Sequence, residues 1–423
     1  MLLGIDVGTS SLKAMLFDPE GHIAPAVVRE PLCVLYPDAE TAELECDELW
    51  GRLVHLLGLL RQEAPFAWGG IKGIGLSVIF PALVPLDAEG RALHQAILYN
   101  DRRGLPQVNR IAAAYGRERF EAQTGNQLTP GTCTLPGLVW LRENRPEVFR
   151  RTRVFGQLST FLIQRLTGEV VVDYTHASLS GLCSAGHEER WDPALLELAG
   201  VSAERLPRLC PSTALAGTTA GLGARECGLP RGIPVAAGSG DAPLAAFGGG
   251  VTQPGKLFVS AGTTDCIMVS SATPSSSAVF CNIHGSTADP LWVVNGTMST
   301  AGGSVQWFCE RFAQTDPDTM AKWADQALPG SRGLVYLPYL QGERTPWWNP
   351  HAKGVMFGLT LMTGREEAAR AIYEGVACGW RQIITLLEAH LGTRPSEITV
   401  VGGGSTNPLW NRIKATALGR PLT

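Results

Sequence analysis

Short apolar segments alternate along this chain with polar turns and longer amphipathic stretches. Leu2 to Val7 and Leu12 to Phe17 are apolar runs of strand length, separated by glycine and hydroxyl residues, and they predict a β-hairpin. From about Arg365, apolar residues recur at helical spacing and predict a helix with a core-facing stripe of Ile372, Val376, Ile383 and Leu387. The alternation of strands and helices predicts an α/β fold.

The hairpin pattern occurs a second time much later in the chain. Leu257 to Val269 contains an apolar strand, the turn Gly262-Thr263-Thr264, the acid Asp265 and a returning strand. Two such hairpins indicate two related halves, each offering a turn to a shared ligand. A chance pair of similar hairpins is the alternative.

The first turn is a candidate phosphate site. Gly8, Thr9 and Ser10 supply successive backbone N–H groups and hydroxyls. Together with the ammonium of Lys13, these groups can converge on phosphate oxygens, and Asp6 would then face a metal ion. An ordinary hairpin with a polar turn remains the alternative.

A second acid follows a glycine-rich strand end. The apolar strand Ile233 to Ala237 continues through Gly238-Ser239-Gly240 into Asp241. Small neighbours let a substrate approach closely, and a carboxylate in such a place can accept the proton of an attacking hydroxyl. The alternative is an aspartate that caps a turn or a helix.

Three consecutive glycines follow the last apolar strand. Ile398 to Val401 leads into Gly402, Gly403 and Gly404, and a helix is expected to begin near Asn407. A run of glycines leaves a flat backbone surface that a planar ligand can contact. The same residues also fit a generic turn between a strand and a helix.

Taken together, these segments resemble the FGGY carbohydrate kinases. The segment GVMFGLTLMTGREEAARAIYE, residues 354–374, closely matches the second signature of that family and departs from it at Ala368. The first signature, at Thr132 to Asn144, is matched less well, because Gly137 stands where the family usually has lysine. The resemblance implies two actin-like (ribonuclease H-like) domains with a catalytic cleft between them, and it extends over nearly the whole chain.

The resemblance also implies ATP and Mg²⁺ as cofactors. Asp241 is then the catalytic base and Asp6 a supporting acid, and both carboxylates hold the metal. Gly403 lies against the adenine base and Asn407 at its edge. The residues expected to bind the nucleotide are Gly8, Thr9, Ser10, Lys13, Gly262, Thr263, Thr264, Gly402, Gly403, Gly404 and Asn407.

The sugar is expected to bind to the first domain. Asp101, in a segment similar to the W-x-D-x-R segment of the family, can accept hydroxyl protons, and Arg103 can order it or donate to the sugar. A turn with a local salt bridge is the alternative. Where xylulokinases typically carry Gln-Met-His, this chain has Ile79-Phe80-Pro81, which removes hydrogen-bond partners of a ketopentose. Phe80 either stacks on a sugar face or fills the core. The resemblance also implies that Asp241 contacts the sugar.

Length and glycine content predict two domains. A chain of 423 residues with 45% hydrophobic residues exceeds a single hydrophobic core. The glycine-rich stretch at residues 248–250 marks the boundary, so we expect an N-terminal domain over residues 1–249 and a C-terminal domain over residues 250–423. Family members usually continue beyond the equivalent of Thr423, so the second domain is expected to be truncated.

Charge and cysteine content exclude several other classes of protein. A net charge of -4 disfavours nucleic acid and anionic membranes as partners. Without a signal peptide or an apolar run of membrane-spanning length, a cytoplasmic protein is expected. The ten cysteines form no C-x-x-C motif and the eight histidines are scattered, so neither a zinc site nor a disulfide framework is indicated, and most cysteines are expected in the core.

We therefore expect a kinase that transfers the γ-phosphoryl group of ATP, in line, to a hydroxyl of a xylulose-like ketopentose or a related sugar or polyol. That small molecule is the expected partner, and a homodimer is the expected assembly. Two alternatives remain: an actin-like ATPase, which would share both hairpins and the glycine turn, and a catalytically impaired, sugar-binding relative. The setting of Asp241, the segment around Asp101 and the second signature favour the kinase.

Overall fold

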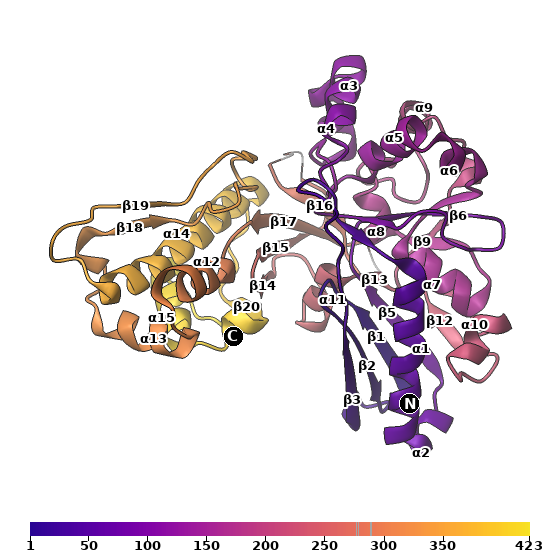
Figure 1. Ribbon diagram of the computed structural model, residues 1–423, viewed down its shortest axis with the longest axis horizontal. Helices are drawn as coiled ribbons and strands as arrows, with labels where there is room; N and C mark the ends of the chain where they lie inside the picture. Colours follow the sequence, from indigo (N-terminus) through magenta and orange to yellow (C-terminus); the bar gives the residue numbers. More distant parts are fainter. Residues whose placement is uncertain (276, 278, 288–289) are drawn as a thin grey trace. The chain divides into compact units, whose positions relative to one another are not determined.

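The computed structural model describes residues 1–275, 277, 279–287 and 290–423, and it separates into two compact units (Figure 1). Unit 1 contains Met1–Leu244 and Ile283–Pro290, and unit 2 contains Ala245–Asn282 and Leu291–Thr423. Both units contain sheets and helices, which confirms the α/β class and the two-domain organisation. The predicted boundary between residues 249 and 250 and the predicted cleft stay predictions.

The main sheet of unit 1 aligns the ends of the segments that carry the candidate acids. Its strands follow the order β11-β12-β5-β1-β2-β3, and β13 also pairs with β5. β1 (Leu2–Val7) and β2 (Ser11–Phe17) are antiparallel, which confirms the first predicted hairpin. β5 (Gly73–Val78) runs parallel to β1, and β13 (Ser239–Gly240) runs parallel to the end of β5. The carboxyl ends of the parallel strands β1, β5 and β13 therefore meet at one edge of the sheet.

Helices and a second sheet complete unit 1. α1 (Cys46–Glu63) packs its leucine-rich face against β2 and β3. A smaller sheet has the order β4-β7-β6-β8, and β9 pairs with β10. The other elements of unit 1 are β3 (Ile23–Pro31), β4 (Glu43–Leu44), α2 (Pro65–Gly69), β6 (Ala82–Leu86), β7 (Ala96–Leu98), α3 (Leu105–Tyr115), α4 (Arg117–Thr124), α5 (Thr134–Asn144), α6 (Pro146–Arg151), β8 (Val154–Gln157), α7 (Leu158–Thr167), β9 (Val171–Asp173), α8 (Tyr174–Ser178), α9 (Pro193–Ala199), the 3₁₀-helix Ala203–Arg205, β10 (Arg208–Cys210), β11 (Leu215–Thr218), α10 (Gly221–Glu226) and β12 (Pro234–Ala236).

Unit 2 is built on a five-stranded sheet of order β16-β17-β15-β14-β20. β14 (Leu257–Ala261) and β15 (Asp265–Ser271) form the second predicted hairpin, and β20 (Ile398–Val401) runs parallel to β14. The helix predicted from about Arg365 is α14 (Arg365–Leu391), and its expected apolar stripe is buried in the core. The other elements are β16 (Cys281–His284), β17 (Trp292–Met298), α12 (Gly302–Trp307), the π-helix Phe308–Ala313, α13 (Pro317–Gln326), the 3₁₀-helix Ser331–Gly333, β18 (Val335–Leu337), β19 (Val355–Phe357), the 3₁₀-helix Gly403–Ser405 and α15 (Pro408–Leu418).

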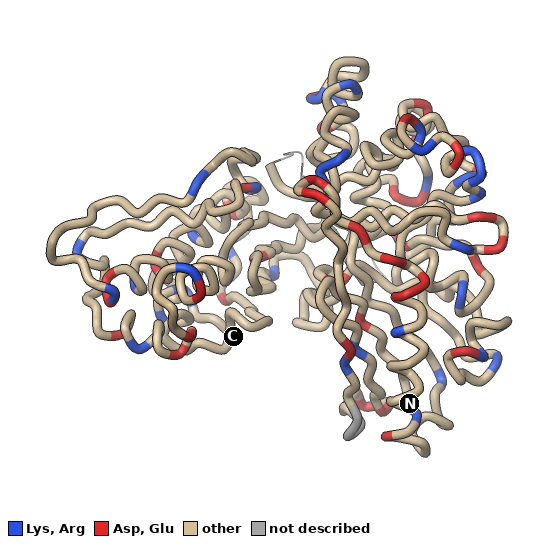
Figure 2. Tube along the Cα trace, viewed as in Figure 1, with Lys and Arg blue, Asp and Glu red and all other residues tan. Residues whose placement is uncertain are grey.

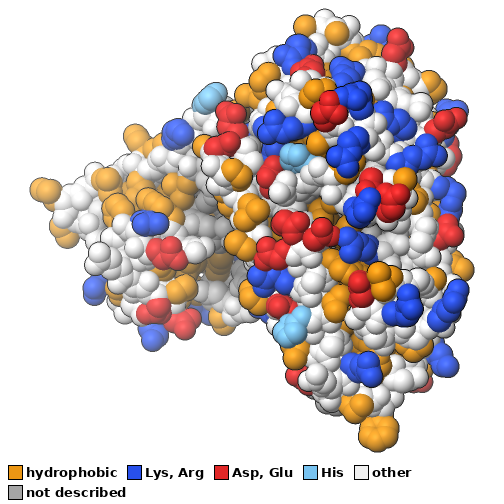
Figure 3. Space-filling model, turned by 45° about the vertical axis from the view of Figure 1, so that its right-hand side comes forward, with side chains coloured by type: hydrophobic (Ala, Val, Ile, Leu, Met, Phe, Trp, Pro, Cys, Tyr) orange, Lys and Arg blue, Asp and Glu red, His pale blue; other side chains and the backbone are white. Residues whose placement is uncertain are grey.

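Basic and acidic residues are interspersed along both units (Figure 2). Apolar side chains also reach the surface in both units (Figure 3). In unit 2, several of them lie at the end of β19 or shortly after it: Phe357, Leu359, Leu361 and Met362. Within the described residues, no helix combines the length and apolar character needed to cross a bilayer. Seven of the ten cysteines are buried, which confirms that most of them are core residues.

One buried carboxyl group makes the stability of the protein depend on pH. Glu188 is 4% exposed, and its Oε1 accepts a hydrogen bond of 3.2 Å from the Gly186 N–H group. Burial raises the pKa of Glu188 from 4.5 to about 8. The folded protein therefore keeps this proton up to about pH 8, whereas the unfolded chain releases it near pH 4.5. The unfolded state binds fewer protons across this window, so stability falls as the pH rises through it.

Replacing Glu188 with glutamine is expected to remove this loss of stability at high pH. At pH 8 the free energy of unfolding of the Glu188→Gln variant should exceed that of the wild type by roughly a few kcal/mol. At pH 4.5 the two proteins should be equally stable. Thermal unfolding of both proteins across this range measures the difference. The matched control is Glu189→Gln, because Glu189 is exposed. Equal unfolding temperatures of Glu188→Gln and wild type at pH 8 would contradict the expectation.

Candidate active site

Asp241 and Asp6 lie at the same edge of the main sheet in unit 1. Ser77 of β5 pairs with Asp6 on one side and with Ser239 of β13 on the other. The chain leaves β13 at Gly240 and begins α11 (Asp241–Gly248) with Asp241 itself. Parallel strands therefore bring together two acids that are far apart in the sequence.

The Asp241 carboxyl group keeps its proton more readily than an ordinary aspartate. Burial raises its pKa from 3.8 to about 6; the Ala242 N–H group opposes this rise, and the negative charge of Asp6 adds to it. The Ala242 N–H group donates to Asp241 Oδ1 at 2.8 Å. Part of the side chain reaches solvent, although protein atoms surround the carboxyl group on most sides. A carboxylate with this pKa is a suitable proton acceptor near neutral pH.

Asp6 is held from two sides by neighbouring strands. Lys13 Nζ donates to its Oδ2 at 3.0 Å, and Ser77 Oγ donates to its Oδ1 at 2.7 Å. Lys13 pairs with Asp6 across the hairpin and Ser77 pairs with it across the parallel ladder, so the strand register fixes both partners. The Asp6 side chain is 32% exposed, which leaves it accessible to a ligand.

The first turn is closed by a backbone hydrogen bond from the Gly8 N–H group, one of the groups that the sequence pattern had offered to phosphate. The Gly8 N–H group donates to the Ser11 carbonyl oxygen at 3.0 Å, and Ser11 is the first residue of β2. Thr9 and Ser10 project at the surface between the two strands, close in sequence to the Asp6–Lys13 pair. The turn thus presents backbone N–H groups and two hydroxyls beside a lysine, as a phosphate site requires.

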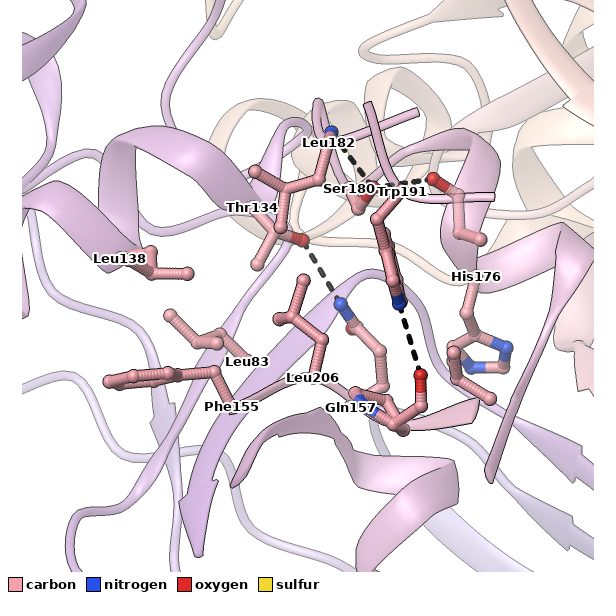
Figure 4. A pocket seen from close by; sticks show the side chains of 13 residues that line it. Leu83, Thr134, Leu138, Phe155, Gln157, His176, Ser180, Leu182, Trp191 and Leu206 are labelled. Atoms are coloured by element: carbon pink, nitrogen blue, oxygen red, sulfur yellow. Dashed lines mark hydrogen bonds between the residues drawn. The ribbon is translucent and has the colours of Figure 1, made fainter. Parts of the chain in front are cut away.

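A buried histidine, His176, acts on Asp241, a role that the sequence pattern did not assign to it. Asp173 caps α8, and its Oδ2 lies 2.5 Å from His176 Nδ1. Burial raises the pKa of Asp241, and an electrostatic interaction with His176 opposes this rise. His176 also lines a cavity of about 10 Å³ within unit 1, together with Gln157, Ser180 and other side chains (Figure 4). The available signal was the acid and the histidine three residues apart after a buried strand.

Phe80 packs beneath the end of β13. Its ring meets the His176 ring edge to face at 5.5 Å between centroids. A Cβ atom added at Gly240 would come within 2.4 Å of the Phe80 ring, so only glycine leaves room there. Phe80 is 9% exposed. This burial favours the core-filling alternative, and contact with a sugar stays a prediction.

Asp101 and Arg103 belong to a buried ion-pair network. Arg103 Nη2 lies 2.7 Å from Asp101 Oδ2 and its Nη1 lies 2.7 Å from Glu43 Oε1. Asp101 is 2% exposed, and both its oxygens accept from backbone N–H groups, of Ala42 and of Arg103. The guanidinium of Arg103 also stacks over Trp140 at 4.8 Å. These contacts use most of the acceptor capacity of Asp101 and favour the salt-bridge alternative; binding of sugar by this pair stays a prediction.

The second turn, in unit 2, is held by a buried acid. The Gly262 N–H group donates to Asp265 Oδ1 at 2.9 Å, and Asp265 is buried. Gly262 and Thr263 are exposed, and their carbonyl groups accept from the start of α12. Thr264 Oγ1 donates to the Ser299 carbonyl oxygen at 3.1 Å. Unlike Asp6, Asp265 faces inwards and orders the turn.

The glycine turn lies beside this hairpin in unit 2. Gly402 has a φ of +94°, and a Cβ atom added there would come within 2.4 Å of the Ala261 carbonyl oxygen, so glycine is required. A Cβ atom added at Gly404 would lie 2.9 Å from the Ala261 side chain, whereas one added at Gly403 meets no atom within 4 Å. Asn407 caps α15 by accepting from the Trp410 N–H group, and its amide lies 3.4 Å from the Tyr373 hydroxyl.

The two acids of unit 1 suit a hard divalent cation. Mg²⁺ binds through one or two carboxylates together with phosphate oxygens and water, not through a dedicated cage of protein ligands. Among the described residues no group of three or more His, Cys, Asp or Glu side chains is arranged to hold a metal ion. The mutual electrostatic repulsion of Asp6 and Asp241 is the feature that a bound cation would relieve.

Comparisons with known proteins agree over the whole chain. Residues 1–248 match the N-terminal domain of the FGGY family of carbohydrate kinases, and residues 257–423 match its C-terminal domain. A xylulose kinase of Escherichia coli is 29% identical over 425 residues, covering 100% of this chain and 86% of the relative. A gluconokinase of Bacillus subtilis is 27% identical, covering 97% and 82%. The crystal structure of a xyloylose kinase from Brucella ovis superposes with a TM-score of 0.92 at 30% identity, covering 99% of this chain and 85% of that one.

Proposed function

The chain belongs to the FGGY family of carbohydrate kinases, and from this premise we propose that it transfers the γ-phosphoryl group of ATP to a hydroxyl of a xylulose-like ketopentose or a related sugar or polyol. As a sugar kinase of this family it uses ATP and acts on a small molecule. The observation that carries the detailed proposal is the position of Asp241, with a pKa of about 6, at the strand edge that it shares with Asp6.

In the proposed reaction, Asp241 accepts the proton of the attacking sugar hydroxyl. Its pKa of about 6 leaves it mostly ionised at neutral pH, and it is basic enough to take the proton as the oxygen attacks phosphorus. Gly240, which precedes Asp241, leaves room for the Phe80 ring beneath the strand end that carries the carboxylate. Phosphoryl transfer requires little covalent chemistry from the protein, so positioning and charge neutralisation account for most of the catalysis.

Asp6 and Asp241 would hold Mg²⁺, and the turn of unit 1 would bind phosphate. When bound, the ion neutralises charge on the phosphate oxygens. Lys13, which pairs with Asp6, would place its ammonium group beside the turn, and Thr9 and Ser10 would donate hydrogen bonds to phosphate. These assignments are supported by the fixed register that places Lys13 and Ser77 against Asp6.

In unit 2, the proposal assigns the nucleotide to the exposed turn Gly262-Thr263-Thr264 and to the glycine turn. Gly262 and Thr263 expose their backbone, and Asp265 fixes the turn from below. The open space over Gly403 suits a flat base. The proposal assigns Asn407, whose Oδ1 caps α15, to the edge of that base. Both turns lie at the ends of neighbouring strands, since β14 pairs with β20.

A methyl group at Gly403 tests the adenosine assignment. The backbone of Gly403 accepts a side chain without strain, so Gly403→Ala is expected to fold normally. The added methyl would occupy the space proposed for the base, and the KM for ATP should rise about tenfold while the KM for the sugar stays unchanged. Initial-rate kinetics measure both constants. Gly58→Ala, at another glycine with no neighbouring atoms, is the control, and an unchanged KM for ATP in Gly403→Ala would remove Gly403 from the site.

The proposal favours a neutral sugar over a sugar acid. Two carboxylates, Asp6 and Asp241, already lie at the strand edge where the substrate hydroxyl would be deprotonated, and a third negative charge would add repulsion. Arg103, within the predicted sugar segment, already pairs with Asp101 and Glu43. Similarity to a xylulose kinase supports a ketopentose, and similarity to a gluconokinase makes gluconate the competitor to test.

A panel of sugars tests the proposed function. ADP release from Mg-ATP would be followed with xylulose, other ketopentoses, glycerol, hexoses and gluconate, for the wild type and for Asp241→Asn. Release that one neutral sugar stimulates and the variant lacks supports the proposal. Sugar-independent release would favour the actin-like ATPase, and no release with any sugar would favour the catalytically impaired relative. If gluconate stimulated ADP release most strongly, gluconate would replace the ketopentose as the proposed substrate.

A further inference from the structure

A lysine is completely buried beneath the glycine turn of unit 2. Lys414 of α15 is 0% exposed, and lysine side chains are almost never fully buried without a compensating partner. Its Nζ donates to the Gly404 carbonyl oxygen at 3.2 Å. The ammonium group therefore contacts the backbone of one of the three glycines proposed to bind the nucleotide.

Two tryptophans surround the rest of the ammonium group. Nζ lies 4.2 Å from the ring centroid of Trp380 and 3.8 Å from that of Trp410. Cation–π contacts of this kind stabilise the charged form where water is absent. Trp410 is fixed in turn, because its Nε1 donates to the Tyr373 carbonyl oxygen at 3.2 Å. The lysine is thus held in one position by rigid neighbours.

Trp380 also contacts the acid beneath the second turn. Its Nε1 donates to Asp265 Oδ2 at 2.6 Å, while Asp265 Oδ1 accepts from the Gly262 N–H group at 2.9 Å. A continuous series of contacts therefore runs from Gly262 through Asp265, Trp380 and Lys414 to Gly404. It joins the turn proposed for phosphate to the turn proposed for adenosine.

We propose that Lys414 is a positioning residue for the nucleotide: its ammonium group holds the Gly404 carbonyl and offsets the buried charge of Asp265, which keeps the two turns in their binding arrangement. This inference rests on the proposed function, because it takes both turns to be nucleotide sites. Lys414 itself is not proposed to contact the nucleotide. Its contribution should appear in nucleotide affinity and not in sugar affinity.

The protonation of the two buried groups gives this role a distinct signature. Burial lowers the pKa of Lys414 to about 8, with Asp265 opposing the change, and burial raises the pKa of Asp265 to about 6, with Lys414 opposing it. Both groups are therefore charged between about pH 6 and pH 8, and above pH 8 Lys414 loses its proton.

Few other charges act on this lysine within the described residues. From β15 the charged group is Asp265, and α14 contributes the uncharged side chains Trp380 and Tyr373. On α15, Arg412 pairs with Asp325 of α13 on the exposed side of the helix. Titration of Lys414 should therefore dominate a change in nucleotide affinity near pH 8.

Calorimetric titration with Mg-ADP at pH 7 and pH 9.5 tests the inference on three proteins. The wild type is expected to bind about tenfold more weakly at pH 9.5, because a charge-assisted contact to the turn is lost. Lys414→Met, an apolar side chain of similar length, is expected to bind about tenfold more weakly at pH 7 and to show no further loss at pH 9.5. Lys322→Met removes an exposed lysine of α13 as the control and should behave as the wild type.

Each outcome decides a separate point. Equal affinities of Lys414→Met and wild type at pH 7, or a wild-type affinity that does not change between pH 7 and pH 9.5, overturn the inference and leave the proposed function standing. The comparison of wild-type affinity at pH 7 and pH 9.5 tests the inference even if Lys414→Met does not fold. A wild type that binds no Mg-ADP at either pH overturns both the inference and the proposed nucleotide site. A KM for sugar that changes as much as the nucleotide affinity would mean a general structural role for Lys414.

Discussion

Replacing Asp241 with asparagine is expected to lower kcat by about 10³-fold, within the range that general-base catalysis contributes. The amide keeps the shape of the side chain and can still accept from the Ala242 N–H group, so the start of α11 should be preserved. The amide has no basicity to take the proton of the sugar hydroxyl. Initial rates of ADP release at saturating ATP and sugar measure the loss.

Two controls accompany this variant. Asp325→Asn changes an exposed aspartate in the same way and should keep wild-type kcat. Because burial of the Asp241 charge is unfavourable, Asp241→Asn should unfold at the same or a higher temperature than the wild type. A kcat within about threefold of the wild type would show that another group takes the proton.

Replacing Asp6 with asparagine is expected to lower kcat by about 10²-fold and to raise the concentration of Mg²⁺ that gives half-maximal rate. The variant keeps an oxygen for Ser77 but loses the ion pair with Lys13 and one of the two carboxylates proposed to hold the cation. Burial is the main cause of the raised pKa of Asp241, and the variant removes the smaller contribution from Asp6, so the remaining activity should extend to somewhat lower pH than that of the wild type. Rates measured over a series of Mg²⁺ concentrations and pH values give both effects.

The control for Asp6 lies in the same hairpin. Asp18→Asn replaces an acid that follows β2 and that pairs with His22 at 2.9 Å at the surface, so kcat and the requirement for Mg²⁺ should not change. If Asp6→Asn kept both the rate and the Mg²⁺ dependence of the wild type, Asp6 would serve the fold through Lys13 and Ser77 and would not take part in catalysis.

Local patterns were sufficient to predict the elements that carry the site. Both hairpins, the strand before the glycine turn and α14 follow from runs of apolar residues with the periods of strands and helices, and these are properties of neighbouring residues. The family resemblance, carried by motifs of the same local kind, gave the kinase class. These are the parts of the structure in which sequence neighbours are also spatial neighbours.

The contacts that define the site could not be predicted in this way. Ser77 meets Asp6, and Phe80 fills the space at Gly240, only because strands distant in sequence pair in one register. Lys414 looks like an ordinary lysine on an amphipathic helix, and its burial depends on two tryptophans and an acid from other elements. Such contacts are set by tertiary packing, which periodicity does not encode. The predicted domain boundary, interdomain cleft, homodimer and cytoplasmic location stay predictions.

The proposed kinase activity is tested most directly by identifying the phosphorylated product. The wild type and Asp241→Asn would be incubated with Mg-ATP and the best sugar of the panel, and the products separated and analysed by mass spectrometry alongside the ADP formed. One sugar phosphate ester per ADP is expected with the wild type, and almost none with the variant. Inorganic phosphate in place of the ester, or equal amounts of ester from both proteins, would contradict it.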